Sequence, residues 1–461
     1  MTNTKILLPF FILLSLLTFF SLNIPFFWDS TFFSTTSVSF YNNGMNGFIA
    51  PLKYDTGGFP LHSSYLTLIW KCFGKTLTVS HLAMLPFLLC AIYEFFKLAK
   101  RYLNEKTIGF ALILLLVHPV FITQSMLMGY DIIILYFFLL SLNALHNNKR
   151  ILFSIAIIFL CLISIRGIML ASVLFILDFI LNKKLDLKFF RVYIPSILIL
   201  LLWAIYHEQQ TGWYLFSPIR ENNHEQFSGA LMMFRQFMYV VWKNIDLGGI
   251  ILWIIFLFSS FYFFKKPKSS QHKELLRYVL ISFFVMSTFM VLIKNPIGHK
   301  YFLVVFALLI VAVCYFIQQI EKLKVRITLF TLIGVCLISG NFILYNQRYG
   351  NAWDSSLKII PYFKIEREMN EYIRKNNIPQ NSVGTQFPLT MNLNVSHLSD
   401  STFHYSDIED ANINYFPYFL YSNIINTNRI EELESIKKNW VVQKEIKSGM
   451  VELILYKNPN L

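Results

Sequence analysis

Long apolar runs separated by short polar stretches make up most of the chain. A helix of about 20 apolar residues is long enough to cross a bilayer. Eleven runs are predicted to be transmembrane helices, at residues 6–27, 78–97, 107–124, 130–146, 151–165, 167–181, 193–206, 247–264, 276–293, 301–319 and 328–345. The pattern therefore predicts an all-α polytopic membrane domain over residues 1–345.

The pattern becomes more polar after Tyr345, and residues 346–461 are predicted to form a small α/β domain outside the membrane. Its predicted elements are an amphipathic helix at 364–376, a short strand at 382–389, and a β-hairpin of strands 440–446 and 450–456. This tail contains no cysteine, so its fold depends on packing rather than on disulfides.

Composition supports a membrane protein, because 55% of the 461 residues are hydrophobic and only 14% are charged. The net charge of +14 arises from Lys and Arg between the apolar runs, which indicates membrane topology rather than nucleic-acid binding. The basic loops are 97–106, 149–150, 183–191, 265–277 and 322–326. These loops are predicted to be cytoplasmic, which places the N-terminus in the cytoplasm and the C-terminal tail outside.

The first outer loop, residues 28–77, is long enough to carry function. Its stretch 60–73 has the spacing of a helix lying flat on the membrane. The long loop 207–246 is also predicted to lie outside. The turn at Arg166, between two short apolar runs, is required for the basic loops to alternate.

Ionisable residues gather at the predicted outer ends of the runs, and Asp29, directly after Trp28, leads this set. A carboxylate at the end of a membrane span is costly unless it is solvated or paired, so it marks a candidate site. The candidate catalytic residues are Asp29 and Asp131, and the candidate substrate-binding residues are Asp55, His62, Arg166, His299, Lys300 and Tyr301.

Structural interpretations compete with these roles. Asp29 could simply end a helix, and the Arg166 and Lys300 side chains could reach lipid headgroups. His62 and His118 could bond backbone carbonyls. The chain has no GxSxG, HExxH, P-loop or dinucleotide-binding glycine pattern in the required context, and its five cysteines lack metal-ligand spacing.

Five short motifs occur in an order that can be compared with known families. They are Phe26-Phe27-Trp28-Asp29, Gly57-Gly58-Phe59-Pro60-Leu61-His62, His118-Pro119 through Asp131, Arg166-Gly167, and Lys300-Tyr301. In this order the chain resembles the integral-membrane glycosyltransferases of the C-type fold (GT-C), which include protein O-mannosyltransferases and lipid A aminoarabinose transferases. The resemblance covers residues 1–320, followed by an outer domain that the family commonly has.

Three positions depart from the family's pattern. Ser30 follows Asp29 where many members have a second acid, Gly58-Phe59 replaces His-Pro, and Lys300 replaces arginine. The missing acid weakens a divalent metal site, so no cofactor is assigned, although a divalent metal is not excluded. Lysine keeps the charge but loses the bidentate guanidinium fork.

The resemblance implies a glycosyltransferase of the bacterial inner membrane. A sugar would leave a polyprenyl-phosphate donor for a hydroxyl of a glycan, lipid or protein acceptor on the outer face. Asp29 would be the general base, and Lys300, His299 and Arg166 would meet the phosphate. Asp131 would orient the acceptor or a cation.

Three alternatives stay open from the sequence. One is a transporter of an amphiphile or lipid-linked oligosaccharide, although the centres of the apolar runs are nearly free of charge. Another is an O-antigen-type polymerase or ligase, for which Arg220 and Arg235 in the 207–246 loop are candidates. The third is a scaffold without activity.

Overall fold

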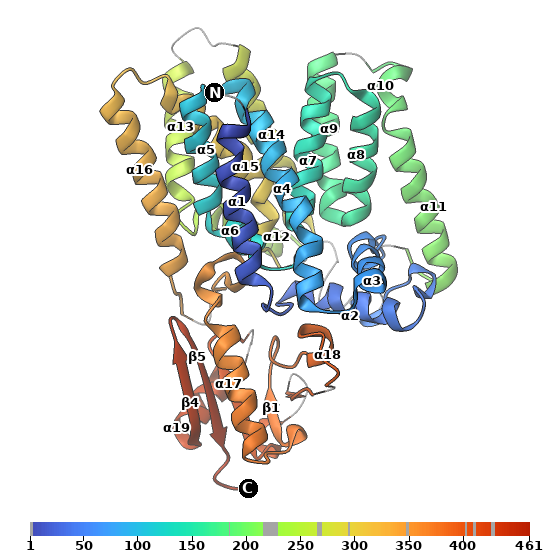
Figure 1. Cartoon of the computed structure of the whole chain (residues 1–461), viewed down its shortest axis with the longest axis vertical. Helices are drawn as coiled ribbons and strands as arrows, with labels where there is room; N and C mark the ends of the chain where they lie inside the picture. The colour runs from blue at the N-terminus through green and yellow to red at the C-terminus, as the bar shows by residue number, and fades with distance from the viewer. Residues whose placement is uncertain are drawn as a thin grey trace.

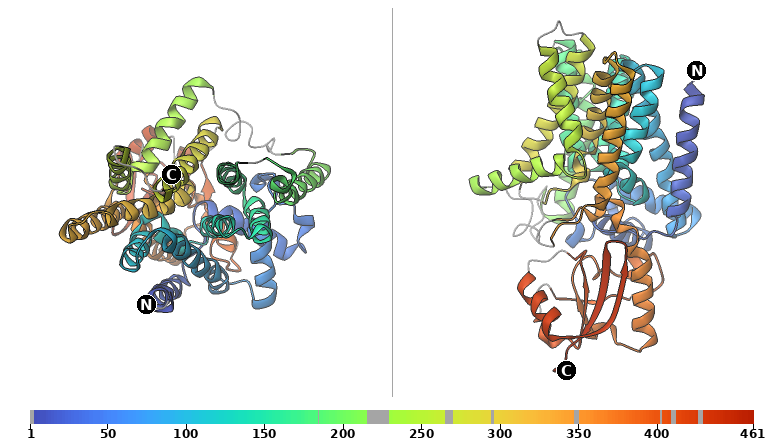
Figure 2. Two further views of the ribbon diagram at one scale, coloured as in Figure 1. Left: turned by 90° about the horizontal axis from the view of Figure 1, so that it is seen from above. Right: turned by 90° about the vertical axis from the view of Figure 1, so that its left-hand side faces the viewer.

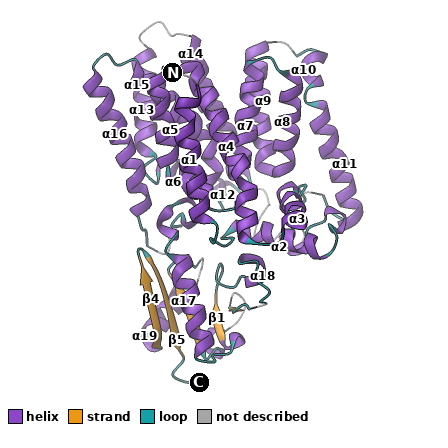
Figure 3. Ribbon diagram, viewed as in Figure 1, coloured by secondary structure: helices purple, strands orange, loops and turns teal. Residues whose placement is uncertain are grey.

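The computed structural model describes residues 3–183, 185–214, 229–264, 270–293, 296–346, 350–401, 403–408, 412–425 and 429–461. A bundle of helices forms its larger part, and a domain with a β-sheet forms its C-terminal part (Figures 1 and 3). Arg220 and parts of the basic loops 183–191 and 265–277 lie outside the described residues.

The helices of the bundle, apart from α10 and α12, follow the predicted apolar runs. They are α1 (Asn3–Ser21), α4 (Leu77–Tyr102), α5 (Glu105–Val117), α6 (Pro119–Met126), α7 (Asp131–His146), α8 (Arg150–Ile163), α9 (Ile165–Asn182), α10 (Leu187–Arg191), α11 (Ile194–Thr211), α12 (Ala230–Ile245), α13 (Ile250–Phe264), α14 (Ser270–Leu292), α15 (Leu303–Gln318) and α16 (Leu323–Ser339). Each of the eleven runs contains a helix, so the mostly helical, multi-span architecture is confirmed.

Fewer helices than eleven qualify as full spans. Among the described residues, six helices are long and apolar enough to cross a membrane, or up to eight if each of two bent pairs is one span. The bent pairs are α5 with α6, at 64°, and α12 with α13, at 93°. Helices α7 and α8 have 16 and 14 residues. At about 1.5 Å per residue they are shorter than a hydrocarbon core of about 30 Å.

Helix α15 is buried along almost its whole length. Every residue from Leu303 to Ile317 is buried, against α14, α13 and α5 among others. A helix that is apolar on all sides is expected in the centre of a bundle. The short helix η3 (His299–Phe302) precedes it directly, so the candidate residues Lys300 and Tyr301 stand on one of the best-packed elements of the fold.

The predicted turn at Arg166 is present, because α8 ends at Ile163 and α9 begins at Ile165. The turn brings two backbones very close together. A Cβ atom on Gly167 would lie 1.8 Å from the carbonyl oxygen of Leu160, so only glycine fits there.

The first outer loop contains the predicted helix, α3 (Leu61–Phe73), and a second helix that the sequence did not indicate, α2 (Asp29–Asn42). Helix α2 is rich in Ser and Thr, which are weak helix formers. Several of its hydroxyls donate to backbone carbonyls four residues earlier, as Thr35 does to Thr31 and Ser37 does to Phe33. Helix α2 could not be predicted from the sequence because it has no clear apolar stripe.

The predicted outer loop 207–246 also contains a helix, which corrects that prediction. Helix α12 covers Ala230–Ile245 and packs against α14. Arg235 and Lys243 interrupt its apolar sequence, so no run of spanning length was recognised.

The C-terminal domain is a five-stranded mixed sheet in the order β2-β1-β3-β5-β4. Its strands are β1 (Val383–Thr385), β2 (Ser406–Asp407), β3 (Tyr418–Ser422), β4 (Val441–Ser448) and β5 (Val451–Lys457), and its helices are α17 (Tyr362–Lys375), α18 (Leu393–Ser396) and α19 (Ile430–Asn439). The predicted helix, short strand and hairpin correspond to α17, β1 and the antiparallel pair β4–β5.

The C-terminal domain lies at one end of the bundle, and the N-terminus lies at the other (Figure 2). Its core continues into the bundle end, where the ring of Phe27 lies 5.8 Å from that of Tyr362 and 5.6 Å from that of Phe363. The backbone nitrogen of Phe26 donates to the carbonyl of Ser396 at 2.8 Å. The segment that leads into α2 is therefore held by the C-terminal domain.

The chain leaves the bundle through a close backbone crossing. A Cβ atom on Gly340, at the end of α16, would lie 2.2 Å from the carbonyl oxygen of Leu247. Leu247 belongs to the bend between α12 and α13. The crossing fixes where the linker to the C-terminal domain begins.

Replacing Gly340 by Ala should lower the stability of the fold, because the new methyl group must displace the Leu247 backbone. Overpacking of this kind costs about 1–3 kcal/mol. Thermal unfolding of the purified protein in detergent measures the effect. Gly334→Ala, on the same helix with no atom within 4 Å of the added Cβ, is the matched control and should be neutral or stabilising. Equal melting temperatures for the two variants would contradict the crossing.

Candidate active site

Lys300 lies between two carboxylates at the end of the bundle that faces the C-terminal domain. Its Nζ is 2.8 Å from Oδ2 of Asp29 and 2.6 Å from Oδ2 of Asp354. The Lys300 side chain is 5% exposed, that of Asp354 12% and that of Asp29 30%. Asp29 is thus the most accessible member of a largely buried ionic cluster.

The two acids occupy the same local sequence, Trp-Asp-Ser, at residues 28–30 and 353–355. In each case the chain turns with a positive φ just before a helix. The φ of Trp28 is 56° before α2, and the φ of Ala352 is 53° before η5 (Trp353–Ser355). Such backbone conformations are strained for residues with side chains and are often found at functional sites.

A second ion pair joins Asp131, the first residue of α7, to Arg166 in the first turn of α9. The Arg166 guanidinium also lies 4.8 Å from the ring centroid of Tyr130 and 4.1 Å from that of Tyr301. Stacking and pairing fix the plane of the guanidinium. Tyr301 directly follows Lys300, so the two ion pairs are neighbours.

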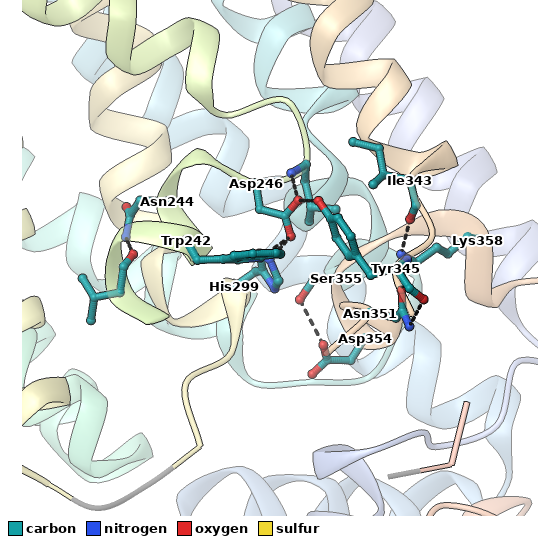
Figure 4. Close-up of polar contacts among 12 residues, drawn as sticks. Trp242, Asn244, Asp246, His299, Ile343, Tyr345, Asn351, Asp354, Ser355 and Lys358 are labelled. Carbon is teal, nitrogen blue, oxygen red and sulfur yellow. Dashed lines mark hydrogen bonds and ion pairs between the residues drawn. The ribbon is translucent and has the colours of Figure 1, made fainter. Parts of the chain in front are cut away.

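Asp246 organises a third polar group, at the bend between α12 and α13 (Figure 4). Its carboxylate accepts from the backbone nitrogen of Leu247 at 2.7 Å, the hydroxyl of Tyr345 at 2.5 Å and the indole of Trp242 at 3.2 Å. Its Oδ2 lies 2.7 Å from Nε2 of His299. This network holds the residue before Lys300 and ties the linker to the bundle.

Six of the eight residues predicted from the sequence meet in this region. They are Asp29, Asp131, Arg166, His299, Lys300 and Tyr301. His62 lies at its edge, with its ring centroid 6.1 Å from that of Tyr130. The convergence that the topology predicted is thus present in the structure.

Asp55 is bound elsewhere. Its Oδ2 lies 2.9 Å from Nε2 of His207 on α11, and its Oδ1 accepts from the backbone nitrogen of Gly57 at 2.9 Å. His207 is completely buried. Asp55 therefore fastens the first outer loop to α11.

The competing interpretation supposed that His62 and His118 bond backbone carbonyls, and the structure does not show such bonds. Within the described part of the chain, neither ring nitrogen of His62 or His118 has a hydrogen-bond partner. The rings of His118 and Phe306 lie 4.6 Å apart. Two other histidines do contact carbonyls: Nε2 of His81 lies 2.9 Å from the oxygen of Ile24, and Nδ1 of His207 lies 3.0 Å from that of Trp213.

Sequence reasoning missed Asp354, Asp246 and Tyr345. Asp354 lies in the part assigned to the outer tail, so no pairing with a membrane residue was expected. The repeated Trp-Asp-Ser could have indicated it. Asp246 directly precedes the apolar run 247–264 and Tyr345 ends the run 328–345, but their pairing could not be predicted because only the bend after α12 and the end of α16 bring them together.

The donor set does not fit a divalent metal. The described residues contain no group of three or more His, Cys, Asp or Glu side chains that could hold an ion. Asp29 and Asp354 do converge, but the ammonium group of Lys300 takes the position between them. Asp131 is likewise paired with Arg166.

Asp354 and Lys358, in the linker to the C-terminal domain, both have displaced pKa values. Burial opposes ionisation of Asp354, but the charge of Lys300 and hydrogen bonds from Lys300 and Ser355 outweigh it and hold the pKa of Asp354 below its usual value. Burial is also the largest influence on Lys358, and it lowers the pKa of that amine to about 8. Lys358 donates to the carbonyl of Ile343 at 2.6 Å.

The fold is that of a multi-span membrane protein of GT-C type with a mixed-sheet C-terminal domain. The chain is similar over 99% of its length to the crystal structure of ArnT from Cupriavidus metallidurans bound to undecaprenyl phosphate, covering 98% of that chain with a TM-score of 0.58 and 12% identity. For ArnT in the apo state the coverages are 98% and 97%, the TM-score 0.54 and the identity 10%.

No family model matches the sequence. No curated protein matches it either. ArnT is a GT-C-fold aminoarabinose transferase, so the resemblance noted in the sequence is confirmed for the fold. At 12% identity the likeness establishes the fold alone.

The lowered pKa of Lys358 should make stability depend on pH in the alkaline range. Between pH 8 and 10.5 the unfolded chain, with a pKa of 10.5, binds a proton that the folded protein releases. Stability therefore rises with pH, by about 3 kcal/mol in total for this group, and no such slope is expected below pH 8. Urea unfolding of wild type and Lys358→Met at pH 7.5, 9 and 10 measures the difference. Parallel curves for the two proteins would contradict the assignment.

Proposed function

We propose that this protein is a glycosyltransferase that moves a sugar from a polyprenyl phosphate to an acceptor hydroxyl. The observation that carries the proposal is the near full-length likeness to a structure that holds undecaprenyl phosphate. The ionic cluster at the end of the bundle supports it, because the reaction needs both a base and cations at one place.

The reaction is proposed to occur on the outer face of the bacterial inner membrane, with the N-terminus in the cytoplasm and the C-terminal domain in the periplasm. The basic loops support this orientation, because they meet at the bundle end away from that domain. Arg101 and His146, beside two of these loops, lie 3.9 and 3.4 Å from Oε1 of Glu274 in a third. Gln318 donates to the carbonyl of Tyr102 at 2.8 Å at the same end.

Asp29 is the proposed general base. Its carboxylate is the most exposed of the cluster, so an acceptor hydroxyl can reach it, and it is paired with the Lys300 ammonium at 2.8 Å. The acceptor oxygen attacks the anomeric carbon of the sugar while its proton passes to Asp29. The bond from that carbon to the phosphate oxygen breaks, and the phosphate leaves with the electron pair.

Lys300 and Arg166 are proposed to stabilise the negative charge of the leaving phosphate. Asp131 has the role of orienting Arg166, with which it is paired. Tyr301 contributes the ring on which that guanidinium rests, and His299 fixes the start of η3 through Asp246.

His62 is proposed to contact the substrate. Burying a polar group without a partner costs free energy, and both ring nitrogens of His62 lack one among the described residues. A sugar or acceptor hydroxyl would supply the missing hydrogen bond. The acceptor itself can be a glycan, a lipid or a protein, and a mannose-type sugar is one of the donors that the family resemblance allows.

Replacing Asp29 by Asn should remove the base while preserving the shape of the side chain. Loss of a well-placed general base typically lowers the rate by about 10²–10⁴-fold. A deletion strain complemented with wild type or Asp29→Asn provides the test, with the modified surface glycan or lipid measured by mass spectrometry. Glu434→Gln, an acid-to-amide change on exposed α19, is the control and should be silent. Wild-type product levels from Asp29→Asn would exclude Asp29 as the base.

Asp354 is proposed to position Lys300, and opposite effects on lipid binding test this. Lys300→Met removes a cation from the phosphate site, so affinity for undecaprenyl phosphate should fall about tenfold or more. Asp354→Asn removes a competing carboxylate, so affinity should stay equal or rise, while product formation falls. Binding is measured on purified protein by native mass spectrometry. Weaker lipid binding by both variants would contradict the positioning role of Asp354 and leave it a purely structural one.

A further inference from the structure

The C-terminal domain carries an open pocket with a volume of about 920 Å³. Arg367, Asn370, Glu371 and Arg374 line it from one face of α17, because residues three, four and seven apart project from the same side of a helix. A volume of several hundred cubic ångströms is typical of sites for small organic ligands.

Hydrogen bonds fix the other walls of the pocket. Ser406 donates to the carbonyl of Asn381 at 3.2 Å, which joins β2 to the turn after α17. The backbone nitrogen of Leu393 donates to the carbonyl of Phe403 at 3.0 Å. The hydroxyl of Tyr405 donates to Oδ1 of Asn370 on α17. The pocket is therefore built from three connected segments rather than from loose surface side chains.

The lining favours a ligand with many hydroxyl groups. The amides of Asn377, Gln380 and Asn381 and the hydroxyls of Ser399 and Ser401 line the pocket. Amides and hydroxyls both donate and accept, which matches the hydroxyls of a sugar. The Ser399 hydroxyl is buried and has no partner within the described residues. Phe403, which also lines the pocket, offers an apolar ring.

The charges of the lining favour an acidic ligand. The guanidinium groups of Arg367 and Arg374 form no ion pair with a carboxylate in the part of the chain that the structure describes. Arg367 donates through Nε to the carbonyl of Phe363 at 3.1 Å. Glu371 is the one acid among the described lining residues. His397 lies 3.5 Å from Oε2 of Glu366. Two guanidinium groups that have no carboxylate partner among the described residues are suited to binding carboxylate or phosphate.

A chain of contacts joins the pocket to Asp29. Tyr362 donates to Oε1 of Glu366, the neighbour of His397, at 2.8 Å. The ring of Tyr362 packs on Phe27, two residues before Asp29. The wall at α18 is also fixed to α2, because the hydroxyl of Ser34 donates to the carbonyl of Val395. The same contacts between the C-terminal domain and the first outer loop therefore hold both the pocket and Asp29.

We propose that this pocket binds an acidic oligosaccharide, with carboxylate or phosphate groups, as part of the acceptor. The identity of the ligand as acceptor rests on the proposed glycosyltransferase function, whereas binding itself does not. The guanidinium groups of Arg367 and Arg374 hold the acidic groups, and the amides and hydroxyls hold the sugar ring.

Isothermal titration calorimetry of the full chain in lipid nanodiscs tests the proposal. The probes are tri-galacturonic acid, mannose 6-phosphate and the neutral control maltotriose. At least one acidic probe should bind tenfold or more tightly than maltotriose, with affinity falling as salt is added. Binding by the carboxylate probe, the phosphate probe or both identifies the acidic group. Equal affinities for acidic and neutral probes, or no binding, would overturn the proposal.

Variants locate the binding at the pocket. Arg374→Glu should weaken binding of the acidic probe tenfold or more, whereas Lys375→Glu, the same charge reversal one residue further and outside the lining, should have little effect. Arg367→Glu provides a second reversal if Arg374→Glu fails to fold, as judged by its melting temperature. Equal weakening by Lys375→Glu would assign the effect to general charge and refute the pocket.

Asp29→Asn separates this proposal from the catalytic one. The variant should bind the acidic probe as wild type does, because Asp29 lies outside the pocket lining. Product formation that survives Asp29→Asn would overturn the proposed base and leave probe binding intact. Conversely, loss of product in Asp29→Asn without any probe binding by wild type would refute the pocket alone.

Discussion

The ammonium group of Lys300, held between Asp29 and Asp354, is the interaction on which the site depends. One carboxylate begins a helix of the first outer loop, and the other lies in the linker to the C-terminal domain. A buried cation requires compensation, and removing one partner of such a group is strongly destabilising. The bundle, the loop and the C-terminal domain are therefore joined electrostatically at the point where chemistry is proposed.

Much of the fold could be predicted because membrane helices appear in the sequence as long apolar runs. The start of α7 at Asp131 and the turn at Arg166 were predicted from such runs, and the β4–β5 hairpin was predicted from the strand signals of the tail. Helices α2 and α12 escaped notice for opposite reasons. The first lacks an apolar stripe, and the second carries charges that interrupt one. Among the described residues, fewer helices than the eleven runs qualify as full spans, because α7 and α8 are short and the run 107–124 is bent between α5 and α6.

The candidate site was predicted as far as single residues allow. Asp29, Lys300 and Arg166 each stand at the end of an apolar run, where a charge is conspicuous. Their partners were harder to find, because Asp354 stands in a polar stretch of the tail, where an acid is not conspicuous, and Asp246, although directly before an apolar run, lies in a loop for which no pairing was predicted. Pairing across more than three hundred positions, as between Asp29 and Asp354 through Lys300, follows from tertiary structure and has no local pattern.

The place of Asp354 has a consequence for the evolution of the chain. Because this acid belongs to the linker and yet neutralises a lysine of the bundle, the two parts are not interchangeable modules. Exchanging the C-terminal domain and its linker for another would leave the buried Lys300 ammonium without its second carboxylate, unless the new linker contained an acid at that place. Successful recombination in this lineage should therefore preserve the Trp-Asp-Ser segment together with the membrane part, with new domains joined downstream of it.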